Sequence, residues 1–156
     1  MKKLDYDKRL LELGIELPEP PKAYFCYVPT VLSEGKLYIS GQINTFNGEL
    51  QREGKLGGDA TIEYGKEAAR LCGLNILSHV RHACGGTLNR VKRCVRLTGY
   101  VNATPDCHSH AQAMDGCSML MQEIFGEVGR HTRTCIGVAS LPFNALIEID
   151  GIFEID

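Results

Sequence analysis

An arginine and a glutamate near the C-terminus have the chemistry to bind and hydrate a small anion. Arg133 lies in the segment TRTCIGVASL, and strand alternation places Cys135, Gly137 and Ala139 on its face. Small neighbours leave space around a guanidinium, whose rigid fork of donors fits a carboxylate. Glu148 lies on the next strand, across a turn, where a carboxylate could hold water or move a proton. Spacing alone is also compatible with a structural ion pair on a sheet surface, which is the more common arrangement.

Two clusters contain the residue types of metal sites. One is His79-Val-Arg-His82-Ala-Cys84, and the other is Cys107-His108-Ser109-His110. His79 and His82 are one turn apart on a predicted helix, but no further ligand pair has the regular spacing of a zinc site. The second cluster lies at the start of a predicted helix, where polar residues serve as caps. We therefore predict no metal at either cluster.

The other reactive residues give weaker signals. Cys135 has His131 four residues upstream, but a cysteine on a strand more often packs than attacks as a nucleophile. The pairs Gly57-Gly58 and Gly85-Gly86 match no nucleotide-binding pattern and are predicted to be turns. Ser40-Gly41-Gln42 could supply a hydroxyl and a close backbone approach at a strand end.

Helices and strands must position these residues. Apolar residues that recur every three or four positions predict helices over 61–84 and 109–125, each followed by glycine. The stripe of the second helix comprises Met114, Cys117, Leu120, Met121 and Ile124. Alternation of apolar residues predicts further elements as strands. These strands are 36–43, 91–101, with Val91, Val95, Leu97 and Val101 on one face, 132–141 and 145–155.

The N-terminal part of the chain is less regular. Leu10, Leu11 and Ile15 predict a short helix within 5–15, and the prolines of LPEPPKA end it. Residues 1–20 are thus expected to form an N-terminal extension. Asn47-Gly48 and Gly57-Gly58 are turn signals, which predict a hairpin or a loop within 44–60.

This order of elements predicts an α+β domain with two layers, in which two helices cover one face of a mixed sheet. A length of 156 residues fits one domain, 1–156. The other face of the sheet would stay uncovered in a monomer. We therefore expect a closed homo-oligomer that buries it.

Composition excludes several classes of protein. The net charge is -2, and no run of five or more like charges occurs, which argues against a nucleic-acid or membrane-surface partner. The seven cysteines are irregularly spaced without C-x-x-C, which favours free thiols in a reducing, cytoplasmic compartment. The charged N-terminus lacks the apolar region of a signal peptide, and no apolar run is long enough to span a bilayer.

Three segments resemble the RidA/YjgF family, also labelled L-PSP endoribonuclease, and in particular its longer, less characterised branch. They are KLYISGQI, VNATPDC and RTCIGVASLPFNALIEIDGIFEI, and the resemblance runs from about Pro21 to the C-terminus. It implies a chorismate-mutase-like fold and a homotrimer with clefts at the subunit interfaces. It further implies hydrolysis of 2-imino or enamine acids to 2-keto acids and ammonia, with no cofactor or metal.

The resemblance also implies roles for individual residues. Arg133 would hold the substrate carboxylate, and Glu148 would position water. The backbone of Cys135 would lie beside the ligand. Tyr27 falls where the family has an aromatic hydroxyl from the N-terminal region, and Ser40-Gly41 matches the family's S-G-Q strand.

Two departures from the family pattern keep other functions open. The archetype's G-P-Y-S-Q segment reads Phe-Cys-Tyr-Val-Pro at 25–29, and Gly137 stands where the archetype has an acidic residue. The site could therefore take a different or larger ligand, or bind a carboxylate metabolite without turnover. Endoribonuclease activity follows only from the family's label, and the acidic charge balance argues against it.

Overall fold

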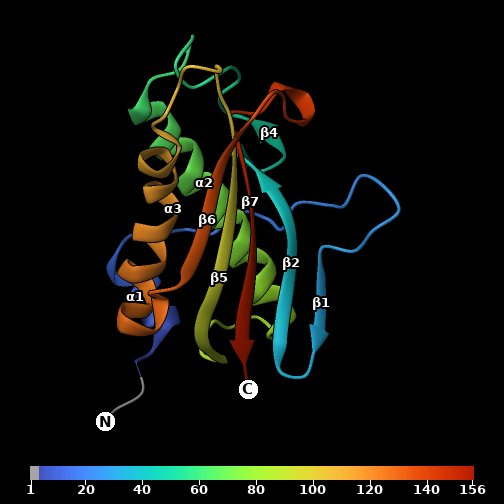
Figure 1. Cartoon of the computed structure of the whole chain (residues 1–156). Coiled ribbons are helices and arrows are strands. Elements are labelled where there is room, and N and C mark those ends of the chain that lie inside the picture. The colour runs from blue at the N-terminus through green and yellow to red at the C-terminus, as the bar shows by residue number, and fades with distance from the viewer. Residues whose placement is uncertain (1–3) are drawn as a thin grey trace.

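Two long helices cover one face of a five-stranded sheet in the computed structural model, which describes residues 4–156 (Figure 1). The helices are α1 (Tyr6–Glu12), α2 (Ile62–Ala83) and α3 (His110–Phe125). The sheet contains β1 (Thr30–Ser33), β2 (Lys36–Ile43), β5 (Val91–Asn102), β6 (Thr132–Val138) and β7 (Ile147–Ile155). A separate hairpin is formed by β3 (Thr45–Phe46) and β4 (Glu49–Leu50), and η1 (Gly126–Gly129) and η2 (Pro142–Asn144) are 3-10 turns. The predicted α+β architecture with a mixed sheet is confirmed.

The helix α2 lies within the predicted range 61–84. Thr61 precedes it, and the Thr61 hydroxyl accepts a hydrogen bond from the backbone N–H of Tyr64 at 3.2 Å. Gly85 follows the helix with a φ of 76°, a left-handed conformation that glycine adopts without strain. Capping signals therefore set both ends.

The helix α3 packs closely against α2. All five residues of its predicted stripe are buried. Gly116 faces α2 so closely that a Cβ there would collide with the carbonyl oxygen of Lys66. The predicted capping at its start is wrong in one respect, because Ser109 occupies the cap position but its side chain makes no capping hydrogen bond.

The register of β5 differs from simple alternation. Its pairing with β7 shifts between Val91 and Arg93 and again between Cys94 and Arg96. Cys94 is consequently fully buried, while Val95 is partly exposed. The prediction that Val95 shares the buried face is wrong because bulges change which side chains point inward.

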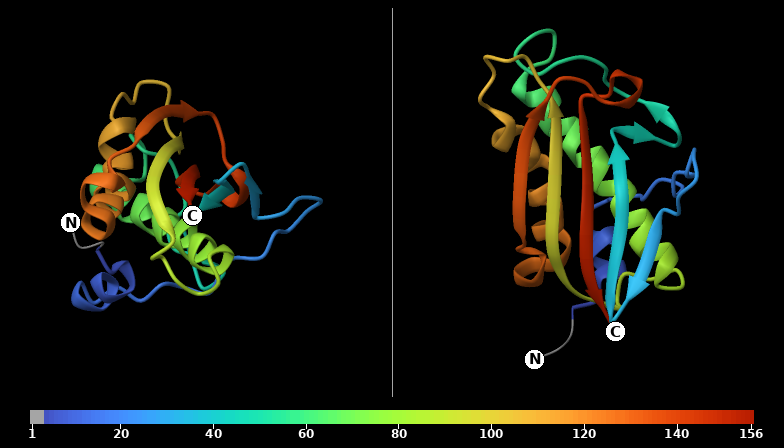
Figure 2. Two further views of the ribbon diagram at one scale, coloured as in Figure 1. Left: turned by 90° about the horizontal axis from the view of Figure 1, so that it is seen from below. Right: turned by 45° about the vertical axis from the view of Figure 1, so that its right-hand side comes forward.

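The order of strands is β1-β2-β7-β5-β6, so the last two strands are not neighbours. The expectation that Glu148 lies on the strand next to Arg133 is therefore wrong. The reason is that α3 connects β5 to β6 as parallel neighbours, and this crossover leaves β6 at the edge. The turn η2 then carries the chain across the end of β5, and β7 inserts between β2 and β5 (Figure 2).

The N-terminal helix lies within the predicted range 5–15. It begins at Tyr6 and ends at Glu12, before Gly14 with a φ of 64°. Of the residues predicted to form its apolar stripe, Leu10 is buried and Leu11 is exposed, and Tyr6 supplies the second buried side chain of the helix. The ring of Tyr6 packs edge-on against that of Phe125, with centroids 4.9 Å apart. The start of the predicted extension, residues 1–3, lies outside the described residues.

Two hairpins complete the fold. Asn47-Gly48 connects β3 to β4 with positive φ at both positions, as the turn signal predicts. The hairpin of β1 and β2 was not anticipated, because β1 has no alternating pattern and three of its four residues are exposed.

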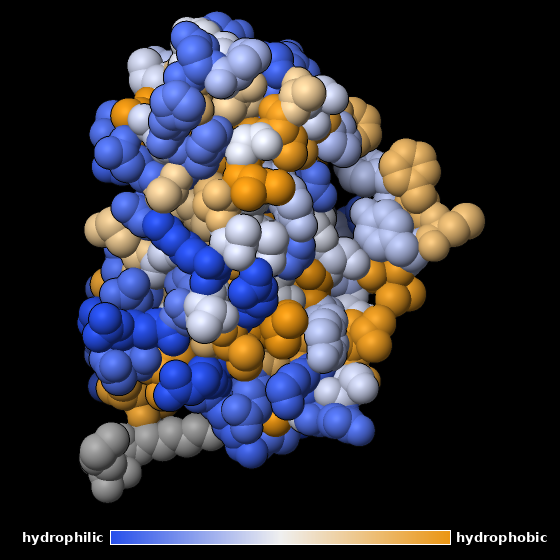
Figure 3. Space-filling model, in the orientation of Figure 1, coloured by the Kyte–Doolittle hydropathy of each residue, from blue (hydrophilic) through white to orange (hydrophobic). Residues whose placement is uncertain are grey.

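One face of the sheet carries no helix. Along β7, buried and partly exposed residues alternate strictly from Ile147 to Ile155. The helices lie against one face of the sheet (Figure 2). The buried set of β7 is therefore on the helix side, and the partly exposed set is on the open face. Figure 3 shows apolar side chains gathered at the side formed by β1 and the preceding loop, where Phe25, Val31 and Leu32 are exposed. No helix within residues 4–156 is both long and apolar enough to cross a membrane.

Candidate functional site

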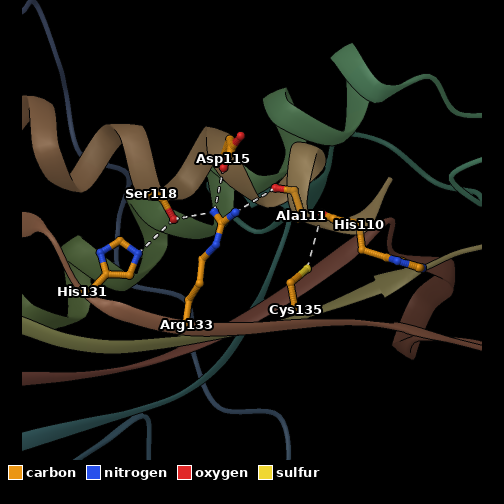
Figure 4. Close-up of polar contacts among 7 residues, drawn as sticks. All are labelled: His110, Ala111, Asp115, Ser118, His131, Arg133 and Cys135. Carbon is orange, nitrogen blue, oxygen red and sulfur yellow. Dashed lines mark hydrogen bonds and ion pairs between the residues drawn. The ribbon is translucent and has the colours of Figure 1, made fainter. Parts of the chain in front are cut away.

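The side chain of Arg133 points from β6 toward α3 and is held by three hydrogen bonds (Figure 4). Its Nη1 donates to Asp115 Oδ1 at 2.8 Å and to Ser118 Oγ at 3.0 Å, and its Nη2 donates to the carbonyl oxygen of Ala111 at 3.3 Å. Three of the five N–H groups of the guanidinium are thereby engaged, and two, one on Nη2 and one on Nε, have no partner within residues 4–156. The side chain is 28% exposed, so these two donors are available to a ligand at the edge of the sheet.

Sheet register and helix periodicity explain this arrangement. Arg133 is paired with Leu97 of β5, which is fully buried beneath the helices, so both side chains point to the helix side. On α3, Ala111, Asp115 and Ser118 follow one another at four and three residues, which places them on one face of the helix.

A further hydrogen bond connects this group to His131. Ser118 Oγ lies 2.9 Å from His131 Nε2, and His131 Nδ1 lies 2.7 Å from the carbonyl oxygen of Gly129. Burial lowers the pKa of His131, the nearby charge of Arg133 lowers it further, and the hydrogen bond to Gly129 opposes them. The imidazole is therefore neutral at pH 7.

Cys135 is on the same face of β6 as Arg133. Its thiol donates to the carbonyl oxygen of His110 at 3.4 Å, and burial raises its pKa to about 11. A thiol in this state is a poor nucleophile. His131 does not assist it, because both ring nitrogens are bonded elsewhere. The space beside Gly137 is filled by the imidazole of His110, with which a Cβ at Gly137 would collide.

Glu148 lies in a cavity of about 260 Å³ on the open side of the sheet. Tyr27 and Gly41 line the same cavity, together with the aromatic rings of Tyr24 and Phe143. The carboxylate of Glu148 fits in this cavity because Gly41 has no side chain. A Cβ at position 41 would collide with the carboxylate. The structure thus brings together three of the residues singled out by the family resemblance.

The carboxylate of Glu148 has no hydrogen-bond or ion-pair partner among residues 4–156, although it is half-buried. Burial raises its pKa, and the negative charge of Asp150 raises it further. A half-buried acceptor without a donor is expensive unless water or a ligand satisfies it. The group is therefore suited to holding water and to exchanging a proton.

Arg133 and Glu148 do not meet within one protomer. On β5, Leu97 is paired with Arg133, and Tyr100 is paired with Glu148. Leu97 and Tyr100 are three positions apart, so Arg133 and Glu148 point to opposite faces of the sheet. Arg133 and Cys135 therefore form one group on the helix side, and Glu148, Tyr27 and Gly41 form another on the open side. Ser40 belongs to neither, because its hydroxyl donates to the carbonyl oxygen of Val28 at 2.8 Å and ties the 25–29 loop to β2.

Sequence reasoning missed the partners of Arg133. Asp115 and Ser118 are polar residues beside the apolar stripe of α3, and only that position could have identified them. Phe143 was also missed, although it has a φ of 59°, which is rare for an aromatic residue and turns its ring toward the cavity and Tyr24.

The two histidines weighed as metal ligands in the sequence differ in exposure. His79 is buried, whereas His82 is exposed. Within the described part of the chain, no three side chains of His, Cys, Asp or Glu are close enough to hold a metal ion together.

The chain matches a known family. The family model described as "YjgF/chorismate mutase-like, putative endoribonuclease" matches residues 7–154. Protein TCP17 of Trypanosoma cruzi is 40% identical over 150 residues, which cover 94% of this chain and 92% of that protein. The chain therefore belongs to the YjgF/chorismate mutase-like family, as the sequence resemblance indicates.

Solved structures agree with this assignment. The crystal structure of protein Atu1372 from Agrobacterium tumefaciens, of unknown function, is 40% identical with a TM-score of 0.89, covering 97% of this chain and 94% of that one. The crystal structure of Escherichia coli TdcF with bound serine is 24% identical with a TM-score of 0.64. The match covers 90% of this chain and 97% of TdcF. At this lower identity the likeness shows the fold alone.

Proposed function

We propose that this protein hydrolyses reactive 2-imino or enamine acids to 2-keto acids and ammonia. The observation that carries the proposal is the half-buried carboxylate of Glu148, which has no protein donor within residues 4–156 and opens into a cavity. Membership of the YjgF family and the two unused donors of Arg133 support it.

The proposed site combines two subunits of a homotrimer. Arg133 and Glu148 lie on opposite faces of one sheet, so a single small ligand can reach both only if they come from different chains. The uncovered sheet face and the exposed apolar residues around β1 provide surfaces for such an assembly. We therefore place Arg133 of one subunit opposite the Glu148 cavity of the next.

The chemistry requires little from the protein. A protonated imine is already electrophilic, so the site needs to hold the carboxylate and deliver water. Arg133 binds the carboxylate through its free N–H groups. Glu148 accepts a hydrogen bond from water and takes its proton as the oxygen attacks the imine carbon. Glu148 gives this proton to the nitrogen of the carbinolamine and then takes the hydroxyl proton as the C–N bond breaks, so that the keto acid and ammonia leave.

The family supports a small amino-acid-like ligand. TdcF, which shares the fold, holds serine in its crystal structure. All seven cysteines of the present chain are free thiols, which is in keeping with the proposed cytoplasmic location.

A second candidate is a protein that binds a carboxylate metabolite without turnover. The observation that favours it is the set of aromatic rings around Glu148, which includes Tyr24 and Phe143 and which could close the cavity to water. Stabilisation by keto acids that is lost in Arg133→Ala, without catalysis, would identify this function.

The direct test adds the protein to a threonine dehydratase or an amino-acid oxidase reaction and follows keto acid release. Acceleration is expected for wild type and for the control Arg130→Ala, in which the substituted side chain is exposed and forms an ion pair with Glu127 at 3.7 Å. Arg133→Ala should remove the acceleration. An unchanged rate with several amino acids, or a fully active Arg133→Ala variant, would reject the proposal.

A further inference from the structure

Ser118 occupies a central position in the group that surrounds Arg133. It is 6% exposed, and its hydroxyl is within hydrogen-bond distance of both Arg133 and His131 (Figure 4). Neither Ser118 nor His131 has a role in the hydrolysis described above.

The directions of these hydrogen bonds follow from their end points. The carbonyl oxygen of Gly129 can only accept, so Nδ1 of His131 carries the proton. Nε2 of the neutral ring then accepts from the hydroxyl of Ser118, at 2.9 Å. The oxygen of Ser118 is left to accept from Nη1 of Arg133, at 3.0 Å. For the neutral ring, this is the one assignment that satisfies all three bonds.

Backbone packing fixes the Gly129 end of this series of hydrogen bonds. A Cβ at Gly129 would collide with the carbonyl oxygen of Met121, so η1 lies directly against α3. The Gly129 carbonyl is thereby held at a defined position, and the ring of His131 with it.

The ion pair with Asp115 cannot fix the guanidinium as firmly. Asp115 is 46% exposed, and an ion pair that water reaches contributes little and tolerates several geometries. The part-buried bond to Ser118 restricts Nη1 more firmly, and together with the bond from Nη2 to Ala111 it sets the direction of the two donors left on Nη2 and Nε.

We propose that Ser118, held by His131, is a positioning residue that orients the Arg133 guanidinium for its anionic ligand. The ligand class, a small carboxylate, rests on the proposed function. We call the series of hydrogen bonds that joins Gly129, His131, Ser118 and Arg133 the relay. It can be tested without a ligand.

Two substitutions of His131 separate a relay from a purely structural role. The amide oxygen of Gln in His131→Gln can reach the position of Nε2 and accept from Ser118. The shorter side chain of His131→Asn can donate to Gly129 but does not reach Ser118. A relay predicts that Gln preserves the orientation of Arg133 and Asn does not. A role confined to the Gly129 turn predicts the reverse.

Crystal structures of wild type, Ser118→Ala and the two His131 variants provide the first measurement. The guanidinium should keep its place in wild type and His131→Gln, and should be displaced or disordered in Ser118→Ala and His131→Asn. Ser118→Cys, which has nearly the same volume and is a weak acceptor, covers the case in which Ser118→Ala does not fold. A guanidinium that stays in place in Ser118→Ala or Ser118→Cys would overturn the proposal.

Calorimetric titration with 2-oxobutanoate provides the second measurement. Ser118→Ala and His131→Asn should weaken binding about tenfold, the usual effect of losing one hydrogen bond to a charged group. Binding that disappears in Arg133→Ala but is unchanged in Ser118→Ala would reject the positioning role and leave the proposed function intact. If Arg133 is displaced in the variants as expected but wild type does not bind 2-oxobutanoate, the proposed function is rejected and the relay is retained.

Discussion

The Arg133 group and the Glu148 cavity lie on opposite faces of the same sheet and differ in how their charges are satisfied. Arg133 has three hydrogen bonds to α3, and two of its donors have no partner in the described part of the chain. Glu148 has no partner within the described residues and lies among aromatic rings. The first charge is oriented by the protein before a ligand arrives, whereas the second is left unsatisfied.

This difference indicates a division of labour. An oriented guanidinium is suited to holding a carboxylate that does not change during the reaction. A desolvated carboxylate with a raised pKa is suited to a proton that moves. Substitutions in the two groups should therefore affect different kinetic constants.

The largest effect is expected for Glu148→Gln. The amide can still hold water but cannot take its proton, so kcat should fall about 100-fold or more with little change in KM. Glu154→Gln is the control, because Glu154 lies on the same strand and the same face. Keto acid release in the coupled assay measures both constants, and a rise in KM alone would show that Glu148 only binds.

A smaller effect, on KM rather than on kcat, is expected for Arg133→Lys. Lysine keeps the charge but loses the planar fork, so KM should rise about tenfold while kcat is nearly unchanged. The same assay measures this. A loss confined to kcat would contradict the assignment of Arg133 to carboxylate binding.

A steric change should disturb one region without touching the other. In Gly41→Ala the new Cβ collides with the Glu148 carboxylate, and kcat should fall several-fold while the affinity for 2-oxobutanoate is kept. Gly58→Ala is the matched control, because its Cβ meets neighbours at distances of 3.4 Å or more. Equal kinetics in Gly41→Ala and wild type would show that the position of Glu148 does not matter.

The pH dependence should shift when Asp150 is neutralised. The base must be ionised, so the rate should fall as the pH drops through the raised pKa of Glu148. In Asp150→Asn one cause of that rise is removed, and the acidic limb of the kcat profile should move to lower pH. An unmoved limb would show that another group is titrated.

The smallest effect concerns stability. Because the pKa of Glu148 is raised on folding, its contribution to stability is present below the unfolded pKa and is lost as pH rises through the folded pKa. Glu148→Gln should therefore have a higher Tm than wild type at pH 8, by less than about 4 °C, and the difference should vanish near pH 4. Thermal unfolding at the two pH values measures it, and a lower Tm at pH 8 would contradict a desolvated, unpaired carboxylate.

Local patterns predicted the elements well, since α2 and α3 each carry a continuous apolar stripe and glycine follows both. The strand order was not predictable in the same way. The short turn before β7 suggested a hairpin with β6, but the parallel crossover through α3 places β5 between them. The face occupied by Arg133 depends on this long-range register, and so do its contacts with Asp115 and Ser118. The family resemblance named Arg133 and Glu148, but neither it nor the spacing placed them on opposite faces.

The central claim is that the carboxylate-binding arginine and the water-binding glutamate of one site come from two subunits. Inactive Arg133→Ala and inactive Glu148→Gln can be mixed in equal amounts, unfolded and refolded together, and assayed for keto acid release. Random assembly should restore about a quarter of the wild-type activity, because about one cleft in four would then receive both intact residues. No recovery from the mixture, with wild type refolding to full activity under the same conditions, would contradict the claim.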